Sequence, residues 1–351
     1  MDTINDMTEG KVSQKILGFF FPMLWTNLLQ QLYSVADTAI VGKGIGDNAL
    51  AAVGIIAAVS LFIIGFSMGL TNGFSVIIAQ SYGSADHSRV RKTVWQSVRL
   101  CVIIAVILTA FSIVFLKQIL QIMQTDSIIM KDTLSYGRII FGGLAVTVAY
   151  NLCSGILRAL GDSKTPFKAI IISSTVNIVL DILMIFLLKT GVAGAAFATI
   201  TAQLVSMIIC ILKIKTLTIM KYDKEERVPD REISSLLLKN GLPMAFMNSL
   251  TAVGCMIVQA YINKLGVDYT SAYSVCTKYL NLFMLPSITA GFTVSAFTGQ
   301  NFGAKKFDRI REGVRAGLLI SFISYIILGA VMNIFPSQLA KFIGHRNIPR
   351  R

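Results

Sequence analysis

The sequence predicts an all-α integral membrane protein. Of its residues, 54% are hydrophobic and only 14% are charged, and the mean hydropathy of +0.68 is too high for one soluble domain. The apolar residues come in runs of about 20, the length that a helix needs to cross a bilayer. Basic residues collect in the short loops between these runs, where the positive-inside rule accounts for them. The net charge of +14 therefore predicts no nucleic-acid partner.

Nine apolar segments are long enough to span a membrane. They cover residues 16–41, 50–80, 94–116, 134–157, 167–188, 192–212, 236–262, 270–298 and 314–335. The longer segments must tilt or protrude from the bilayer.

Loop charges predict the orientation of these spans. Clusters of Lys and Arg occupy every second loop, whereas the loops between them carry one or two lysines each. The clusters lie within residues 11–15, 89–92, 158–168, 213–239 and 305–311. Because basic loops stay on the cytoplasmic side, we expect a multi-pass protein of the cytoplasmic membrane with a cytoplasmic N-terminus.

An internal repeat divides the chain. AQSYGSADHSRVRKTV at Ala79 matches GQNFGAKKFDRIREGV at Gly299, an offset of 220 residues, and FPMLWTNLLQ at Phe21 resembles LPMAFMNSLT at Leu242. Six spans separate the two copies, so both start on the same side of the membrane. A parallel repeat of this kind places a substrate site between two lobes near the midplane.

The repeat predicts four regions. Residues 1–214 form an N-terminal lobe of six helices, and 215–235 form a cytoplasmic linker. Residues 236–343 form a partial C-terminal lobe of three helices, and 344–351 form an atypical basic tail.

Two carboxylates lie inside the apolar segments. Asp181 stands in TVNIVLDILMIFLL, with Asn177 one turn earlier on the same helical face. Asp37 closes the first segment, with Tyr33 and Gln30 on the same stripe. An Asp at the centre of a membrane helix costs about 2.5–3.5 kcal/mol, so such acids usually face an interior and bind something. We interpret the chain as built to bring the two acids together.

Simpler interpretations exist for these residues. Asp37 can be an interfacial residue near a helix end. Tyr33, Gln30 and Asn151 either line a substrate cavity or bridge helices. Thr199, in GVAGAAFATITA, is by its pattern an ordinary small residue of a packing face.

The sequence does not predict an enzyme. Its two histidines are His87, in a basic loop, and His345, in the tail, and no nucleophile is paired with a base within the spans. The five cysteines all fall in apolar segments without metal-ligand spacing, so we expect them to be packing residues.

Several motifs resemble one family of transporters. QQLYSVADTAIVGKGIGDNALAAVG, AQSYGSADHSRVRK and SGILRALGDSKTPF are similar to the multidrug and toxic compound extrusion (MATE) family, over nearly the whole chain. The resemblance implies a two-lobe MATE-like bundle around a central cavity. It implies a cation-coupled antiporter that exports cationic or amphipathic drugs by alternating access. The implied partners are small drug-like molecules and membrane lipid, for a monomer without a cofactor.

The resemblance also implies a coupling site. In the branch that resembles the DNA-damage-inducible F proteins, an Asp on helix one, an Asn and an Asp on helix five and a Thr on helix six hold the coupling cation. These fall on Asp37, Asn177, Asp181 and Thr199. At ~1.5 Å per residue, Asp37, Asp181 and Thr199 lie at depths within about 5 Å of each other.

The sequence does not choose the coupling ion. Two carboxylates in a low dielectric repel, so one tends to hold a proton unless a cation lies between them. The carboxylate, amide and hydroxyl oxygens of the four residues suit Na⁺, and a single carboxylate suffices for H⁺.

The family pattern fails at the C-terminal end. A two-lobe exporter of this kind has twelve spans, and FPSQLAKFIGHRNIPRR after Ile334 leaves the repeat at about Ile343. We expect a truncated or frameshifted product, which can be inactive. The alternative function is a flippase of lipid-linked precursors with a related two-lobe plan; a cavity ringed with Arg and Lys would favour it.

Overall fold

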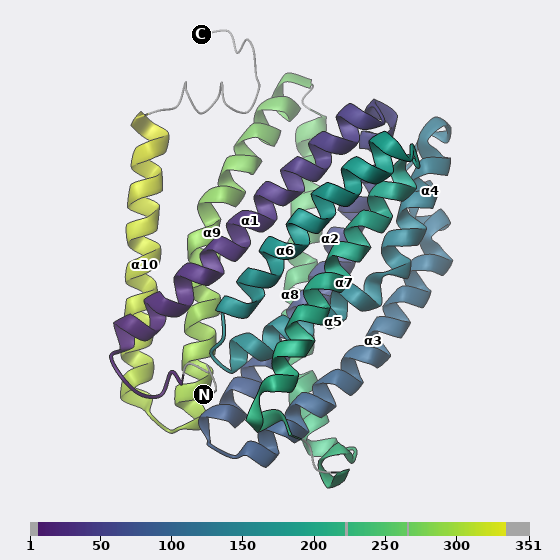
Figure 1. Ribbon diagram of the computed structural model, residues 1–351. Coiled ribbons are helices and arrows are strands. Elements are labelled where there is room, and N and C mark those ends of the chain that lie inside the picture. The colour runs from purple at the N-terminus through teal and green to yellow at the C-terminus, as the bar shows by residue number, and fades with distance from the viewer. Residues whose placement is uncertain (1–5, 222–223, 265–266, 335–351) are drawn as a thin grey trace.

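The computed structural model describes residues 6–221, 224–264 and 267–334, and these residues are helical with no strand among them (Figure 1). The first half contains α1 (Val12–Gly44), α2 (Asp47–Gly83), α3 (His87–Ile122), α4 (Ser127–Gly142), α5 (Leu144–Ala159), α6 (Lys164–Asp181) and α7 (Val192–Thr216). The second half contains α8 (Arg231–Asn263), α9 (Val267–Gly303) and α10 (Phe307–Ile334). Three short helices, the π-helix η1 (Ile182–Leu187) and the 3₁₀ helices η2 (Thr218–Met220) and η3 (Lys224–Arg227), lie between them. The all-helical prediction is confirmed; the tail at 344–351 and the end of the partial lobe at 343 lie outside the described residues.

Seven of the helices are long and apolar enough to cross a membrane, or eight if the bent pair α4 and α5 is one span. The predicted span over 134–157 falls on this pair, whose two helices meet at an angle of 43°. The predicted span over 16–41 is helical as part of α1 but is not among the seven. Its many polar residues, including Asn27, Gln30 and Gln31, lower its hydropathy.

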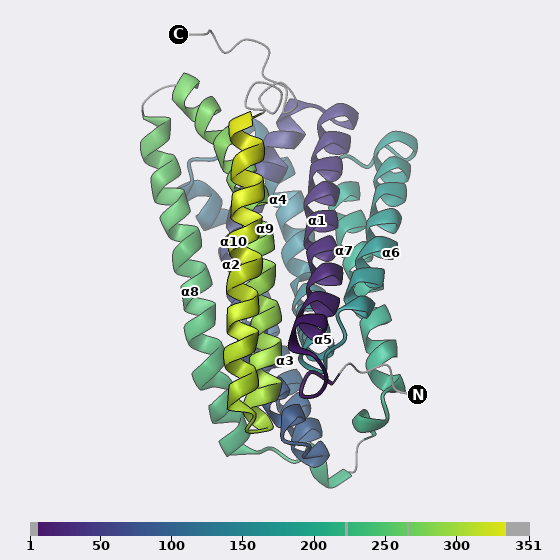
Figure 2. The same cartoon turned by 90° about the vertical axis from the view of Figure 1, so that its left-hand side faces the viewer.

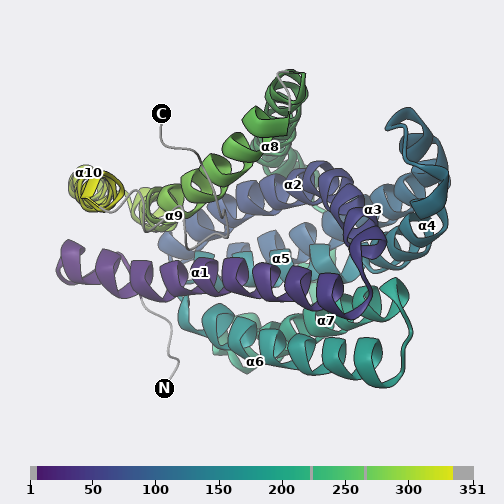
Figure 3. The same ribbon diagram turned by 90° about the horizontal axis from the view of Figure 1, so that it is seen from above.

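The helices run roughly along one direction as a bundle. α1 and α6 lie side by side, and α6 packs on α7 (Figure 1). Seen from above, α5 lies between these helices and α2 (Figure 3). α8 and α9 pack against α2, and α10 lies beyond α9 (Figure 2). The second half is thus attached to the first mainly through α2, and also through the N-terminal part of α1.

Glycines bring the two halves into backbone contact along α2. A Cβ atom built on Gly73 would lie 2.5 Å from the Cα of Gly241 on α8, and one on Gly69 would lie 2.4 Å from the carbonyl oxygen of Met244. At the end of α2, a Cβ on Gly83 would lie 1.8 Å from the carbonyl oxygen of Gln300 on α9. These distances are shorter than any real Cβ contact, so only glycine fits at these positions.

The segment before α1 is also held between the halves. The side chain of Gln300 accepts a hydrogen bond from the backbone N–H of Met7 (2.9 Å) and donates one to the carbonyl oxygen of Ala159 at the end of α5 (2.8 Å). Arg309, at the start of α10, donates to the carbonyl oxygens of Met7 and Gly10. Met7 and Gln300 are fully buried. The buried side chain of Gln300 therefore connects the segment before α1, the end of α5 and α9.

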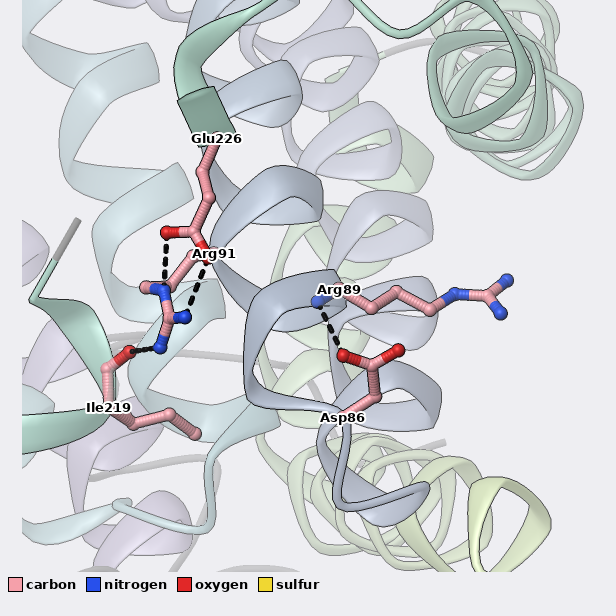
Figure 4. A network of polar contacts seen from close by, with 5 residues as sticks. All are labelled: Asp86, Arg89, Arg91, Ile219 and Glu226. Carbon is pink, nitrogen blue, oxygen red and sulfur yellow. Dashed lines mark hydrogen bonds and ion pairs between the residues drawn. The ribbon is translucent and has the colours of Figure 1, made fainter. Parts of the chain in front are cut away.

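The linker between the halves is fixed to the start of α3 (Figure 4). Arg91 binds Glu226 through two hydrogen bonds of 2.5 and 2.6 Å and also donates to the carbonyl oxygen of Ile219. The side chains of Trp95 and Gln96 donate to the carbonyl oxygens of Arg227 and Val228. A planar guanidinium that binds a carboxylate at two points fixes orientation as well as distance. The contacts of Ile219 and of residues 226–228 therefore fix these described parts of the linker against α3.

Candidate cation and substrate site

The helix that carries Asn177 and Asp181 begins at a well-formed cap. In the motif LRALGDSKTP, Asp162 accepts hydrogen bonds from the backbone N–H groups of Lys164 (3.0 Å) and Thr165 (2.9 Å). Gly161 precedes it with φ of +88°, a left-handed conformation that glycine adopts without strain. The cap satisfies donors at the start of α6 that have no partner within the helix. It fixes where α6 starts and thereby where its two polar residues lie.

Asn177, Asp181 and Thr199 form one connected group between α6 and α7. With the amide nitrogen of Asn177 facing the acid, Nδ2 lies 2.7 Å from Oδ2 of Asp181, and Oδ1 lies 3.3 Å from the backbone nitrogen of Thr199. Asn177 and Asp181 are fully buried. The hydroxyl of Thr199 donates to the carbonyl oxygen of Ala195 (3.0 Å), so its own lone pairs remain available.

Asp37 on α1 completes the group from the opposite helix. Its carboxyl group lies within hydrogen-bonding reach of that of Asp181. Oδ1 of Asp37 and Oδ1 of Asp181 are both buried and accept no hydrogen bond. Buried oxygens without a donor are costly, because they have lost water without gaining a partner. Two such oxygens on adjacent acids are a place where a proton or a small cation would bind.

Two tyrosines approach the same group. Tyr33 on α1 and Tyr136 on α4 both lie close to the Thr199 side chain and to the two acids. Tyr136 was not predicted from the sequence. Its segment, TLSYGRIIFG, has no feature that marks a site, and only the bend after α4 shows that this helix reaches α7.

The bend between α4 and α5 brings them close to Thr199. A Cβ on Gly143, the residue between the two helices, would lie 2.4 Å from Cδ1 of Ile200. Ile200 is the neighbour of Thr199 on α7. The absence of a side chain at Gly143 therefore lets the junction of α4 and α5 pack directly against the helix that carries the site.

A widened turn follows Asp181 immediately. η1 is a π-helix, in which the backbone N–H of Leu188 donates to the carbonyl oxygen of Leu183 (2.9 Å). Its side chains meet the end of α1, since a Cβ on Gly44 would lie 2.5 Å from Cγ2 of Ile185. Turns of this kind occur often at functional sites. Here the turn joins the ends of the two helices that carry the acids.

The remaining predicted cavity residues are not part of this group. Gln30 is half-buried on α1, and Asn151 on α5 has a buried amide nitrogen that makes no hydrogen bond. Within the described ranges, neither of them forms a hydrogen bond with the acids. The described residues contain no group of three or more His, Cys, Asp and Glu side chains suited to a metal. A cation here would depend on two carboxylates with Asn177 and Thr199, and the roles of all these residues stay predictions.

The fold is that of a helical membrane protein with a polar group buried between its helices. The family model described as MatE matches residues 22–183 and 243–348, more than half of the chain, so the protein belongs to the MATE family. The prediction of the family is confirmed, whereas the DNA-damage-inducible branch and the truncation stay predictions.

Relatives in the family include several transporters. The chain is 28% identical over 329 residues to the probable multidrug resistance protein YoeA of Bacillus subtilis strain 168, covering 92% of this chain and 71% of that protein. It is 25% identical to a probable multidrug resistance protein NorM of Thermotoga maritima, covering 94% and 72%. It is also 22% identical to a FAD transporter of Shewanella oneidensis, covering 95% and 75%.

Solved structures confirm the fold. A crystal structure of a MATE protein in the straight conformation matches with a TM-score of 0.89 at 25% identity, covering 96% of this chain and 76% of that one. An outward-facing multidrug resistance MATE transporter matches with a TM-score of 0.91 at 24% identity, covering 98% and 76%.

Proposed function

We propose that this protein is an antiporter that exports drug-like cationic or amphipathic compounds across the cytoplasmic membrane, driven by entry of Na⁺ or H⁺. The observation that carries the proposal is the adjacent pair of acids, half-buried Asp37 and fully buried Asp181, each with one buried oxygen that accepts no hydrogen bond. Two apolar residues at these positions would stabilise the contact between the helices better than two acids do. Acids inside membrane-length helices are therefore better explained by a function in binding. The multidrug resistance relatives supply the substrate class.

Coupling follows from the charge balance of the pair. When both acids are ionised they repel, and a cation or a proton between them removes that repulsion. Because the acids belong to α1 and α6, their repulsion acts on the packing of these two helices. A cation that binds one arrangement of α1 and α6 better than another shifts the protein toward that arrangement. The protein thereby links the cation gradient to the relative position of α1 and α6.

Alternating access is the proposed transport mechanism. α1 contacts both halves, since it packs on α6 in the first half and on α9 and α10 in the second. Asn27 on α1 donates a hydrogen bond to Thr289 on α9 (2.8 Å). A change near Asp37 would therefore be transmitted along α1 to the contact between the halves. Transport without catalysis of a chemical reaction follows from this mechanism, so the protein is not an enzyme.

The test is drug accumulation in proteoliposomes that carry an imposed Na⁺ gradient, an imposed H⁺ gradient, or neither. Asp181→Asn keeps the side-chain shape but removes the charge, and we expect gradient-driven accumulation to fall to the level of empty liposomes. Asp47→Asn, an exposed acid at the start of α2, is the matched control and should transport normally. Unchanged transport by Asp181→Asn would refute the coupling role. The arm that drives transport identifies the ion.

A second candidate is export of an anionic compound. One relative is a FAD transporter. Arg158 at the end of α5 lines a small pocket together with Asn72 of α2 and Ser295 of α9, so that a guanidinium lies where the halves meet. An excess of FAD in the same liposome assay distinguishes the candidates. It would block transport of a cationic drug only if both compounds use one site.

A further inference from the structure

A groove opens between α3 and the start of α8, away from the acid pair. Its volume is about 930 Å³. It lies where the first and second halves meet on the outside of the bundle, and its mouth is formed by the end of the linker at Pro229 and Asp230. Because Arg91 and Glu226 hold the linker against α3, the mouth has a defined position.

The charges of the groove are strongly one-sided. Arg99 on α3 and Arg231 and Lys239 on α8 line it, and all three are exposed. Asp230 is the single acid of the lining, and its carboxylate is used as the cap of α8, where it accepts from the backbone N–H of Ile233 (3.0 Å). Neither ion pair found in the described part of the chain uses Arg99 or Lys239. The groove therefore presents cations that are not neutralised within the protein.

The deeper part of the groove is apolar. Leu100 and Ile103 follow Arg99 along α3, and Leu238 and Leu242 lie beside Lys239 on α8. α3 and α8 both run from the loops predicted to be cytoplasmic into the predicted spans 94–116 and 236–262. The cations thus lie near the cytoplasmic boundary of both spans, and the apolar residues continue toward the bilayer interior.

We propose that this groove binds an anionic phospholipid of the cytoplasmic leaflet, with the phosphate between Arg99 and Lys239 and the acyl chains along Ile103 and Leu242. The lining is polar and cationic toward the linker and apolar toward the bilayer interior, which matches the two ends of a phospholipid. Basic pockets between membrane helices on the cytoplasmic side bind lipid head groups in this way. The apolar floor favours a lipid over a free anion, which would gain nothing from it.

The position of the groove gives the lipid a function. Its two walls come from different halves, because α3 belongs to the first and α8 to the second. A lipid that contacts both walls would stabilise the arrangement of the two halves seen in this structure. It would be released when α3 and α8 move apart. The local lipid composition would then bias the conformational equilibrium without contact with the acids.

Native mass spectrometry of the detergent-solubilised protein tests the proposal. The probes are phosphatidylglycerol, phosphatidylcholine with the same acyl chains, and inorganic phosphate. We expect one phosphatidylglycerol per protein to be retained in preference to phosphatidylcholine, with no retention of inorganic phosphate. Arg99→Gln combined with Lys239→Gln should weaken phosphatidylglycerol binding by roughly 30-fold, since each basic residue near a membrane surface contributes about 1 kcal/mol.

The matched control removes two positive charges outside the groove. Lys117→Gln combined with Lys131→Gln changes two exposed lysines, one of them also on α3, and should leave binding within about two-fold of wild type, because neither lysine lines the groove. The exchange Arg99→Lys with Lys239→Arg keeps both charges and should retain the lipid. Equal losses in the two Gln variants would overturn the proposal. So would equal retention of phosphatidylcholine, or inorganic phosphate binding as tightly as the lipid.

Discussion

Gly83 and Gln300 bring α2 and α9 into direct backbone contact, and the repeat reproduces this contact in reverse. A Cβ on Gly83 would lie 1.8 Å from the carbonyl oxygen of Gln300, and a Cβ on Gly303 would lie 2.0 Å from the carbonyl oxygen of Gln80. Gln80 and Gln300, like Gly83 and Gly303, are equivalent positions of the repeat. The halves therefore meet here through the same surface on both sides, as in an isologous dimer contact.

Substitution at this contact should weaken the packing of the halves. Gly83→Ala places a methyl group against backbone that cannot rotate away, so we expect a loss of about 1–3 kcal/mol, as in other overpacked positions. Gly65→Ala on the same helix is the matched control, because a Cβ there meets nothing within 4 Å. Thermal unfolding in detergent checks the difference. Equal unfolding midpoints for Gly83→Ala and Gly65→Ala would show that the contact between α2 and α9 accommodates a methyl group at position 83 without loss of stability.

The linker clamp should show a strong coupling energy. Arg91 and Glu226 are 17% and 7% exposed at their side chains, so removing either leaves a poorly solvated charge. In a double-mutant cycle with Arg91→Met and Glu226→Gln, we expect a coupling of about 0.5–3 kcal/mol in unfolding free energy. The exposed pair of Arg311 and Asp308, 3.8 Å apart, is the control and should show no measurable coupling. A cycle without coupling at Arg91 would mean that the backbone contacts alone hold the linker.

The two acids should behave as one unit in transport. Asp37→Asn should abolish gradient-driven export as Asp181→Asn does, because either change removes the charge pair. The double variant should then be no worse than the worse single variant, since residues that act together are non-additive. Transport rates in proteoliposomes measure this. Additive losses would indicate two separate cation sites.

Orientation can be tested with reporter fusions. If loop charges set the topology, a reporter inserted after Lys224 is expected in the cytoplasm and one inserted after Lys264 outside it. Alkaline phosphatase, active only outside the cytoplasm, and green fluorescent protein, fluorescent inside, give opposite signals at each position. The reversed pattern would invert the predicted membrane orientation.

Much of the helical framework was predictable because membrane spans are long and apolar. The exceptions have physical causes. The bend between α4 and α5 occurs at Gly142 and Gly143, and an apolar run with two glycines has the same composition whether it is straight or bent. α1 is less apolar than the seven helices suited to cross a membrane, because it carries Gln30, Tyr33 and Asp37.

The candidate site was predictable only in part. Asp181 is conspicuous because a carboxylate in an apolar run is costly. Thr199 has no such mark, and its assignment came from the family resemblance. Tyr136 was missed because the group is assembled from four helices, and helical periodicity relates only residues of one helix. The repeat identified Gln80 and Gln300 as equivalent, but periodicity alone could not show that they face each other.

The π-helix after Asp181 amounts to one residue inserted into a regular helix. Such a turn holds the extra residue within one widened turn, so removing one residue from Ile182–Leu187 would restore regular α-helical geometry there. Ile185 and Phe186 would then turn away from Gly44. The shorter helix would be more regular, yet the end of α1 would lose the surface on which it rests.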